Sequence, residues 1–524
     1  MTKLIAASIG ILFLNAAITA NAQTPQRGGT LVMVLTQDPP MVNPNITSGV
    51  PDKIIGCMIH EGMVDMGYGY QPKPRLAKTW NISPDGLTYT FDLIEANWQD
   101  GKPMTSEDVK FSLEELSAKH SSVFAASGRA MDKIETPARD KVVIKMKQPY
   151  GPFMLSLACE QSGAILPAHI YRGTDPFRNP ATTATPVGTG PFQLVEWKRG
   201  DYLRLSRNPT YYKKDMPYFD GIVAKVITQP AARIQALQAG EVDYVPTMPA
   251  SNVEQVRADP KLKVEYGEYP PSSNFLFFNI KNKPFDDKRV RHALLMATDR
   301  DFLIKNVFFN VGEQGINPFN RQLPWAVDPS IDFRKIYPFD PAKANAELDS
   351  AGYKRGADGK RFGVRMVIFA TEYIELTQVA VALKSMWQAV GVDVNIEALE
   401  SAALTQRVFV DRDFDVTMTG YTTYSDPALG TSRAYLGSSV GKLYGNPSNY
   451  ANPEVDRLFD EGERATNHEE RAKSYFQVQR ILADDLPAFI LRDYTQIDGI
   501  SRRVQNMWGE ARGDGRYGEG WFSK

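Results

Sequence analysis

Apolar and polar positions along this chain follow two different periods, which is typical of mixed α/β structure. Residues 78–93 place apolar side chains at every second position around a turn at residues 83–86, which predicts a β-hairpin with one buried face. A helix should follow, because Thr105 can cap it together with Asp108 and the next apolar residues recur at helical spacing. Further hairpin segments are predicted at residues 141–147 and 192–207.

The second half of the chain alternates helices and strands more regularly. This order is typical of a sheet that is covered by helices. No internal repeat or flexible linker interrupts it, so we expect ordered strands to cross between any separate lobes. Helices are predicted at residues 341–352, 374–390, 453–465 and 469–484, and strands at residues 364–370, 392–396, 414–419 and 487–491.

The apolar run at the N terminus has the pattern of a secretory signal peptide. A basic residue precedes the apolar residues 4–18, and a small-residue triplet at residues 20–22 can be read by a signal peptidase. The run is shorter than the roughly 20 residues that cross a bilayer. We therefore interpret residues 1–22 as a cleavable signal peptide and expect a mature chain from Gln23 outside the cytoplasm, which is the periplasm if the source is a Gram-negative bacterium.

Composition narrows the class of protein and its partners. The chain has 524 residues, of which 43% are hydrophobic, so it can build two or more cores. Its 60 basic and 61 acidic residues form no block of like charge, which argues against a nucleic-acid partner. The two cysteines, Cys57 and Cys159, each lie in an apolar helical context, and we interpret them as buried free thiols rather than as a disulfide.

Motifs for catalysis or metal binding are weak. Residues 437–441 match the nucleophile elbow of hydrolases around Ser439, but Gly, Ser, Asn and Pro flank them where a strand and a helix are required. We interpret this match as accidental and keep an exported serine hydrolase as the alternative from another class. The five histidines are scattered without metal-ligand spacing, so we expect no metal site and no cofactor.

A family resemblance emerges when short segments are taken in chain order. Each segment is weak alone, but the series runs across nearly the whole mature chain. Together they resemble the family 5 extracellular solute-binding proteins, which are the dipeptide-, oligopeptide- and nickel-binding components of ABC importers. The segments are GGTLV at residues 28–32, LAKTW at 76–80, SPDGLTY at 83–89, WQDGKPMTSEDV at 98–109, PVGTGPF at 186–192, RNPTYY at 207–212, AGEVD at 239–243 and FDDKRVR at 285–291.

The resemblance implies an α/β fold of two lobes with mixed sheets, an inserted subdomain in the first lobe, and a hinge and ligand cleft between the lobes. The first lobe would comprise residues 23–271 and 493–524, with the subdomain at about 52–185, and the second lobe residues 272–492. Hinge closure would trap a small polar solute, with a short peptide as the first expectation. A monomer would then deliver it to inner-membrane ABC permease subunits that work with cytoplasmic ATPases.

Two segments resemble cleft loops of the family. The first is Ser48-Gly49-Val50, on which oligopeptide binders lay the main chain of the peptide. The second begins at Tyr421 and in peptide binders soon presents an aspartate to the ligand's α-ammonium group, but here that place falls on Thr423 or Tyr424. Recognition of a free N-terminus is therefore in doubt. The candidate ligand-binding residues are Ser48, Gly49, Val50, Tyr421, Thr422, Thr423, Tyr424, Asp426 and Arg433.

More than one class of ligand fits these residues. Arg433 could pair with a ligand carboxylate or, with about equal weight, with Asp426. Tyrosines in this region could face a wet cleft, although Tyr444 and Tyr450 fit half-buried surface positions better. The family also includes binders of opines, oligosaccharides, glutathione, haem and nickel chelates, so a non-peptide solute is the nearest alternative.

Overall fold

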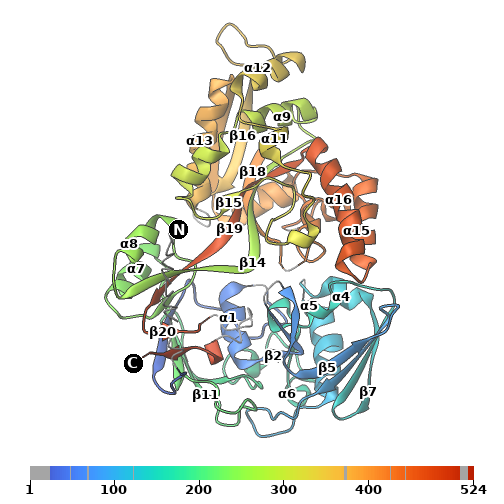
Figure 1. Cartoon of the computed structure of the whole chain (residues 1–524), viewed down its shortest axis with the longest axis vertical. Coiled ribbons are helices and arrows are strands. Elements are labelled where there is room, and N and C mark those ends of the chain that lie inside the picture. Colours follow the sequence, from blue (N-terminus) through green and yellow to red (C-terminus); the bar gives the residue numbers. More distant parts are fainter. Residues whose placement is uncertain are drawn as a thin grey trace, which may run out of the picture.

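The computed structural model describes residues 24–47, 49–67, 70–121, 123–370, 374–424, 426–442, 444–507 and 517–523, and it has two lobes (Figure 1). The lower lobe in Figure 1 is built mainly from the first half of the chain, and the upper lobe from later residues. The predicted signal peptide and Ser48 lie outside the described residues. Within the described part, no helix is both long and apolar enough to span a bilayer.

One large sheet runs through both lobes. Strand β1 pairs parallel with β12 and β13, and β16 pairs parallel with β17 and β18, while the central strands β19, β14 and β18 pair antiparallel. The sheet is therefore mixed, as predicted. Its order is β10 (Phe192–Lys198), β11 (Tyr202–Arg207), β12 (Gly221–Val226), β1 (Thr30–Leu35), β13 (Tyr244–Val245), β19 (Ala488–Ser501), β14 (Leu262–Phe278), β18 (Val416–Thr422), β16 (Phe362–Phe369) and β17 (Val392–Leu399), with β15 (Glu313–Gln314) beside β19.

Strands β14 and β19 carry the chain between the lobes (Figure 1). They contain 17 and 14 residues and pair from Leu262↔Ser501 in the lower lobe to Phe277↔Ala488 in the upper lobe. Their register shifts between Gly267 and Ser272, next to the predicted lobe boundaries. The lobes are thus joined by ordered crossing strands, as predicted.

The lower lobe contains a separate four-stranded antiparallel sheet in the order β5-β6-β8-β7. The hairpin predicted at residues 78–93 forms its first two strands, and Thr105 and Asp108 form the predicted capping box before α2. The helix then widens into a π-helix at Phe111–Ser117, which no sequence pattern indicated. The remaining elements of this lobe include β5 (Ala77–Ile82), β6 (Thr88–Leu93), β7 (Met131–Ala138), β8 (Lys141–Met146), α1 (Val50–Ile59), α2 (Ser106–Lys110), α4 (Ala125–Ala130), α5 (Phe153–Ser156), α6 (Ala168–Tyr171), α7 (Pro230–Gln238) and α8 (Val253–Arg257).

Alternation along β14 divides the upper lobe into two cores. Phe275 and Phe277 face one apolar cluster, which α15 and α16 cover, whereas Leu276 and Phe278 face the other, which α9 and α13 cover. The helices predicted in this half of the chain are all present within two residues of their expected ends. They are α12 (Pro341–Ser350), α13 (Ile374–Ala389), α15 (Pro453–Arg464) and α16 (His468–Asp485). The lobe also contains α9 (Lys288–Met296) and the shorter helices α10 (Arg300–Phe302), α11 (Phe333–Ile336) and α14 (Ser401–Thr405).

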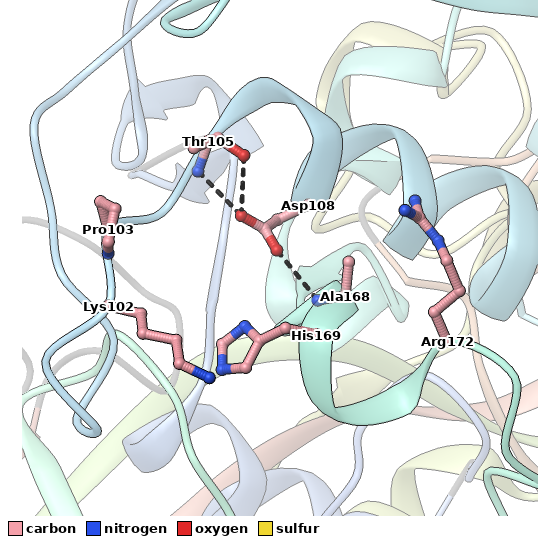
Figure 2. A pocket seen from close by; sticks show the side chains of 7 residues that line it. All are labelled: Lys102, Pro103, Thr105, Asp108, Ala168, His169 and Arg172. Carbon is pink, nitrogen blue, oxygen red and sulfur yellow. Dashed lines mark hydrogen bonds between the residues drawn. The ribbon is translucent and has the colours of Figure 1, made fainter.

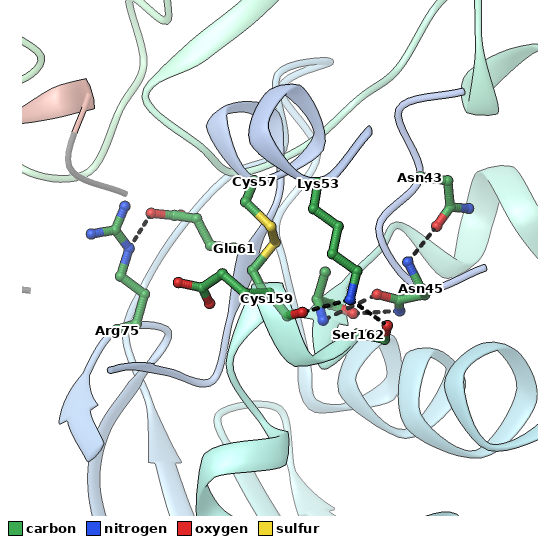
Figure 3. The surroundings of a disulfide bond; sticks show 10 residues. Asn43, Asn45, Lys53, Cys57, Glu61, Arg75, Cys159 and Ser162 are labelled. Atoms are coloured by element: carbon green, nitrogen blue, oxygen red, sulfur yellow. Dashed lines mark hydrogen bonds and ion pairs between the residues drawn. A yellow bond between two sulfur atoms is a disulfide. The ribbon is translucent and has the colours of Figure 1, made fainter. Parts of the chain in front are cut away.

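The interpretation of Cys57 and Cys159 as free thiols is wrong. They form a disulfide with a Cα–Cα distance of 5.9 Å, which ties α1 to the 3-10 turn at Cys159–Gln161 (Figure 3). Lys53 on α1 adds a second tie, because its Nζ donates to the Glu160 carbonyl at 2.5 Å. Both cysteines are buried, as their apolar context predicted, but they lie 102 positions apart and no local pattern reveals their contact.

Candidate ligand site between the lobes

The first-lobe segment ends at the N-terminus of α1, a helix in the part of the lower lobe next to the upper lobe (Figure 1). Gly49 is the N-cap, and Val50 is 66% exposed, whereas the next residues of α1 are largely buried. The Gly49 N–H donates to Thr47 Oγ1 at 3.1 Å, and its carbonyl accepts from the Lys53 N–H at 3.1 Å. The backbone of Gly49 is thus bonded within its own segment, and Val50 is the exposed residue among those of this loop that the structure describes.

Tyr421 lies in the core of the upper lobe. Its side chain is 2% exposed, and the ring packs against Phe275 and Phe277 with centroids 5.5 and 5.4 Å away. Its hydroxyl donates to the Gly445 carbonyl. Tyr421 therefore has the environment of a core aromatic residue in this arrangement of the lobes.

The two threonines that follow are fixed to the crossing strand β14. Thr422 pairs with Ser272 in the β14–β18 ladder. Thr423 is buried, and both its N–H and its Oγ1 donate to the Pro271 carbonyl, at 2.7 and 2.9 Å. These bonds hold the start of the second-lobe loop beside the crossing strands β14 and β19.

Asp426 is bound by a buried arginine that the sequence analysis did not connect with it. Asp426 is 1% exposed, and its two carboxylate oxygens accept from Nη1 and Nη2 of Arg471, both at 2.6 Å. The alternative pairing of Asp426 with Arg433 is not formed. Arg471 shares one face of α16 with the buried residues Tyr475, Val478 and Leu482, and this was the signal in the sequence that it is buried.

Tyr424 and Arg433 are the partly exposed members of the second-lobe candidates. Arg433 Cζ lies 5.0 Å from the centroid of Tyr421 and 5.8 Å from that of Tyr424, so the guanidinium is held against both rings. Its Nη2 donates to the Thr422 carbonyl at 3.2 Å. Tyr424 adopts a left-handed backbone, with φ of 51°, just after the chain leaves β18.

A second contact joins the lobes on the side of the inserted subdomain. The Gly151 N–H donates to the carbonyl of Glu463, at the end of α15, at 2.8 Å. Leu429 from the second-lobe loop packs against the core of the subdomain, and Tyr70 from the lower lobe joins the α15–α16 core. The second-lobe loop therefore lies between the hinge strands and this contact, with lower-lobe residues against it.

A hollow of about 530 Å³ near α6 is a different feature (Figure 2). Its lining charges already have partners. Asp108 accepts from the Thr105 and Ala168 N–H groups at 2.8 and 2.9 Å, and His169 contacts Asp100 at 2.7 Å. Ala168 and His169 of α6 line it, and α6 lies at the foot of the lower lobe in Figure 1, away from the upper lobe, so the hollow is not part of the site between the lobes.

The structure also places the residues considered for chemistry. Ser439 ends a 3-10 turn at Gly437–Ser439 with loops on both sides, and the strand–turn–helix of a nucleophile elbow does not surround it. No group of three or more His, Cys, Asp or Glu is placed to hold a metal ion in the described part of the chain.

Comparisons with known proteins place this geometry in a family. The family model for bacterial extracellular solute-binding proteins, family 5 (middle part), matches residues 71–442. The oligopeptide-binding protein AppA of Bacillus subtilis is 27% identical over 90% of this chain and 88% of its own length. The glutathione-binding protein GsiB of Pectobacterium atrosepticum is 27% identical over 83% of this chain and 82% of its own length.

Solved structures show the same fold. AppA in complex with a nonapeptide has a TM-score of 0.79 at 25% identity and covers 96% of this chain and 100% of its own. The binding protein AgaA of A. tumefaciens R10, in complex with agropinic acid, has a TM-score of 0.77 at 24% identity and covers 95% and 99%.

Proposed function

Because the chain belongs to family 5 of the bacterial extracellular solute-binding proteins, we propose that it is the solute-binding component of an ABC importer for short peptides. The observation that carries this proposal is the family match over residues 71–442 in a chain whose two lobes are joined by paired strands. AppA, which aligns with 90% of the chain, supports peptides as the ligand class.

The mechanism proposed is hinge closure. A ligand that contacts Val50 in one lobe and the loop of Tyr424 and Arg433 in the other stabilises the closed state, because only that state offers both sets of contacts. Inner-membrane permease subunits with cytoplasmic ATPases would then recognise the closed protein. The signal peptide would direct export and be cleaved after Ala22, which N-terminal sequencing of the periplasmic protein would test.

The direct test is binding. Calorimetry of the mature protein with a defined set of di- to nonapeptides should give dissociation constants near the micromolar range, about −8 kcal/mol. If no peptide binds while a different solute is released on denaturation and identified by mass spectrometry, the peptide part of the proposal is wrong.

A non-peptide solute is the second candidate. It could be an opine, oligosaccharide, glutathione or nickel chelate; an oligosaccharide, for example, has no α-ammonium group and would need no free aspartate, and Asp426 is engaged by Arg471. We propose binding without catalysis, so Ser439→Ala should leave solute binding unchanged and no serine-reactive fluorophosphonate should label the wild-type protein.

A further inference from the structure

Arg433 is a cation whose partners within the chain are incomplete. Its guanidinium carries five N–H donors. The structure gives it one hydrogen bond, to the Thr422 carbonyl at 3.2 Å, and its buried Nε has no partner. No described carboxylate pairs with it. A guanidinium that is partly removed from water and has no counter-ion costs free energy, so this position favours a negatively charged partner from outside the chain.

Three buried arginines of this chain show what such a partner looks like. Arg75 donates from Nε to Glu61 at 2.6 Å, and Arg471 binds Asp426 through two nitrogens. Arg492 donates to Glu375 at 2.7 Å. Each of these three arginines has a carboxylate partner within the protein, whereas Arg433 has none among the described residues.

The surroundings of Arg433 restrict what can fill it. The two tyrosine rings lie beside the guanidinium, and a planar group with two oxygens suits its remaining N–H donors. Thr423 fixes the loop to Pro271, and Leu429 places it against the lower lobe, so the loop borders the space between the lobes. Asp426 is neutralised by Arg471, so Arg433 carries the charge that this loop offers.

We propose that Arg433 binds a carboxylate of the transported solute, and that the site therefore selects acidic solutes through this group rather than through an ammonium. Tyr424 orients the guanidinium and adds apolar contact. This inference rests on the proposed import function. The carboxylate can be the C-terminus of a peptide or the acid group of a non-peptide solute, and the experiment separates the two.

The test is calorimetry with four probes: tri-L-alanine, its C-terminal amide, its N-acetyl form, and octopine as a non-peptide dicarboxylate. Wild type is compared with Arg433→Gln, with Arg433→Lys, and with Arg457→Gln as a control on the exposed face of α15. Arg433→Lys keeps the positive charge but lacks the paired N–H donors that can bind both oxygens of a carboxylate. It therefore separates the effect of losing the charge from the effect of losing this geometry. Thermal melting of each apo variant shows that the chain is folded.

We expect the amide to bind at least about tenfold more weakly than the acid in wild type, and less than about threefold more weakly in Arg433→Gln. Acetylation should cost less than about threefold, and Arg433→Lys should lie between wild type and Arg433→Gln. Arg457→Gln should match wild type. Equal binding of acid and amide by wild type, or a larger loss from acetylation, would overturn the inference while leaving the import of peptides in place.

Octopine separates the two proposals. If octopine binds to wild type, loses at least about tenfold in Arg433→Gln, and no peptide binds, the carboxylate contact is supported and peptide import is wrong. If neither the probes nor any solute released on denaturation binds, both proposals are wrong.

Discussion

The backbone N–H of Gly151 donates a 2.8 Å hydrogen bond to the carbonyl of Glu463, which links the inserted subdomain to the end of α15 across the two lobes. A Cβ at Gly151 would lie 2.7 Å from the Ala465 carbonyl oxygen and 2.9 Å from Arg471 Nε. Closeness of this kind leaves no room for a side chain. The contact is therefore sensitive to a single methyl group.

Gly151→Ala should weaken ligand binding by roughly tenfold, about 1.4 kcal/mol, because the methyl group prevents the lobes from meeting. The apo melting temperature should change little, since each lobe keeps its own core. Calorimetry measures the affinity, and small-angle scattering should show a more open apo form. Gly363→Ala is the matched control, because its nearest atom lies 3.9 Å away. Unchanged affinity and radius of gyration would contradict this role.

Glu463 should make the lobe contact sensitive to pH. Burial, followed by Asp460 and Asp426, raises the pKa of Glu463 from 4.5 to about 7, although Arg129 and Arg471 oppose the shift. The folded chain then keeps a proton between about pH 4.5 and 7 that the unfolded chain has released. The contribution of this group to stability is full below pH 4.5 and falls as the pH rises to about 7.

We expect ligand affinity in wild type to fall severalfold between pH 6 and 8. Each unit by which lobe closure raises the pKa of Glu463 corresponds to roughly 1.4 kcal/mol of binding free energy lost at high pH. Glu463→Gln should remove this dependence and keep the affinity of the low-pH form. Identical pH profiles for the two proteins would show that Glu463 does not titrate with closure.

Asp426 should act on stability and not on ligand choice. Asp426→Asn leaves the buried Arg471 without its counter-ion, which should lower the free energy of unfolding by about 3–5 kcal/mol in urea denaturation. The double variant Asp426→Asn with Arg471→Met should recover part of this loss. A ligand-specific loss of affinity with unchanged stability would instead make Asp426 a ligand contact.

Removing the disulfide should destabilise the lower lobe. Replacing both Cys57 and Cys159 by serine frees a loop of 102 residues, and we expect the free energy of unfolding to fall by roughly 2–5 kcal/mol. Wild type reduced with dithiothreitol is the control and should show the same loss in urea denaturation. An unchanged midpoint in the double variant would contradict the prediction.

Secondary structure could be predicted from the sequence wherever the signal is local. The hairpin at residues 78–93 and the capping box of Thr105 depend on residues within a few positions of each other, and both are present. The crossing strands were also predictable, because no linker composition separates the halves of the chain.

The environment of the candidate site could not be predicted in the same way. The face of β18 that Tyr421 occupies depends on its pairing with Ser273 in β14, which is a long-range register. The partner of Asp426 is 45 positions away on α16. Tyr450, expected at the surface, is buried with its hydroxyl bonded to Asp485, because α16 covers it.

The pairing of β14 with β19 gives the upper lobe a practical property. Ser272, where the upper lobe is predicted to begin, pairs in one ladder with Tyr494, two residues beyond its predicted end. The upper lobe is thus an insertion with adjacent ends, so it can be exchanged as one cassette without altering the lower lobe's connectivity. Chimaeras joined at Ser272 and Tyr494 would place the upper lobe, with its Arg433 loop, on the lower lobe of a relative. Their ligand preference would show which lobe determines it.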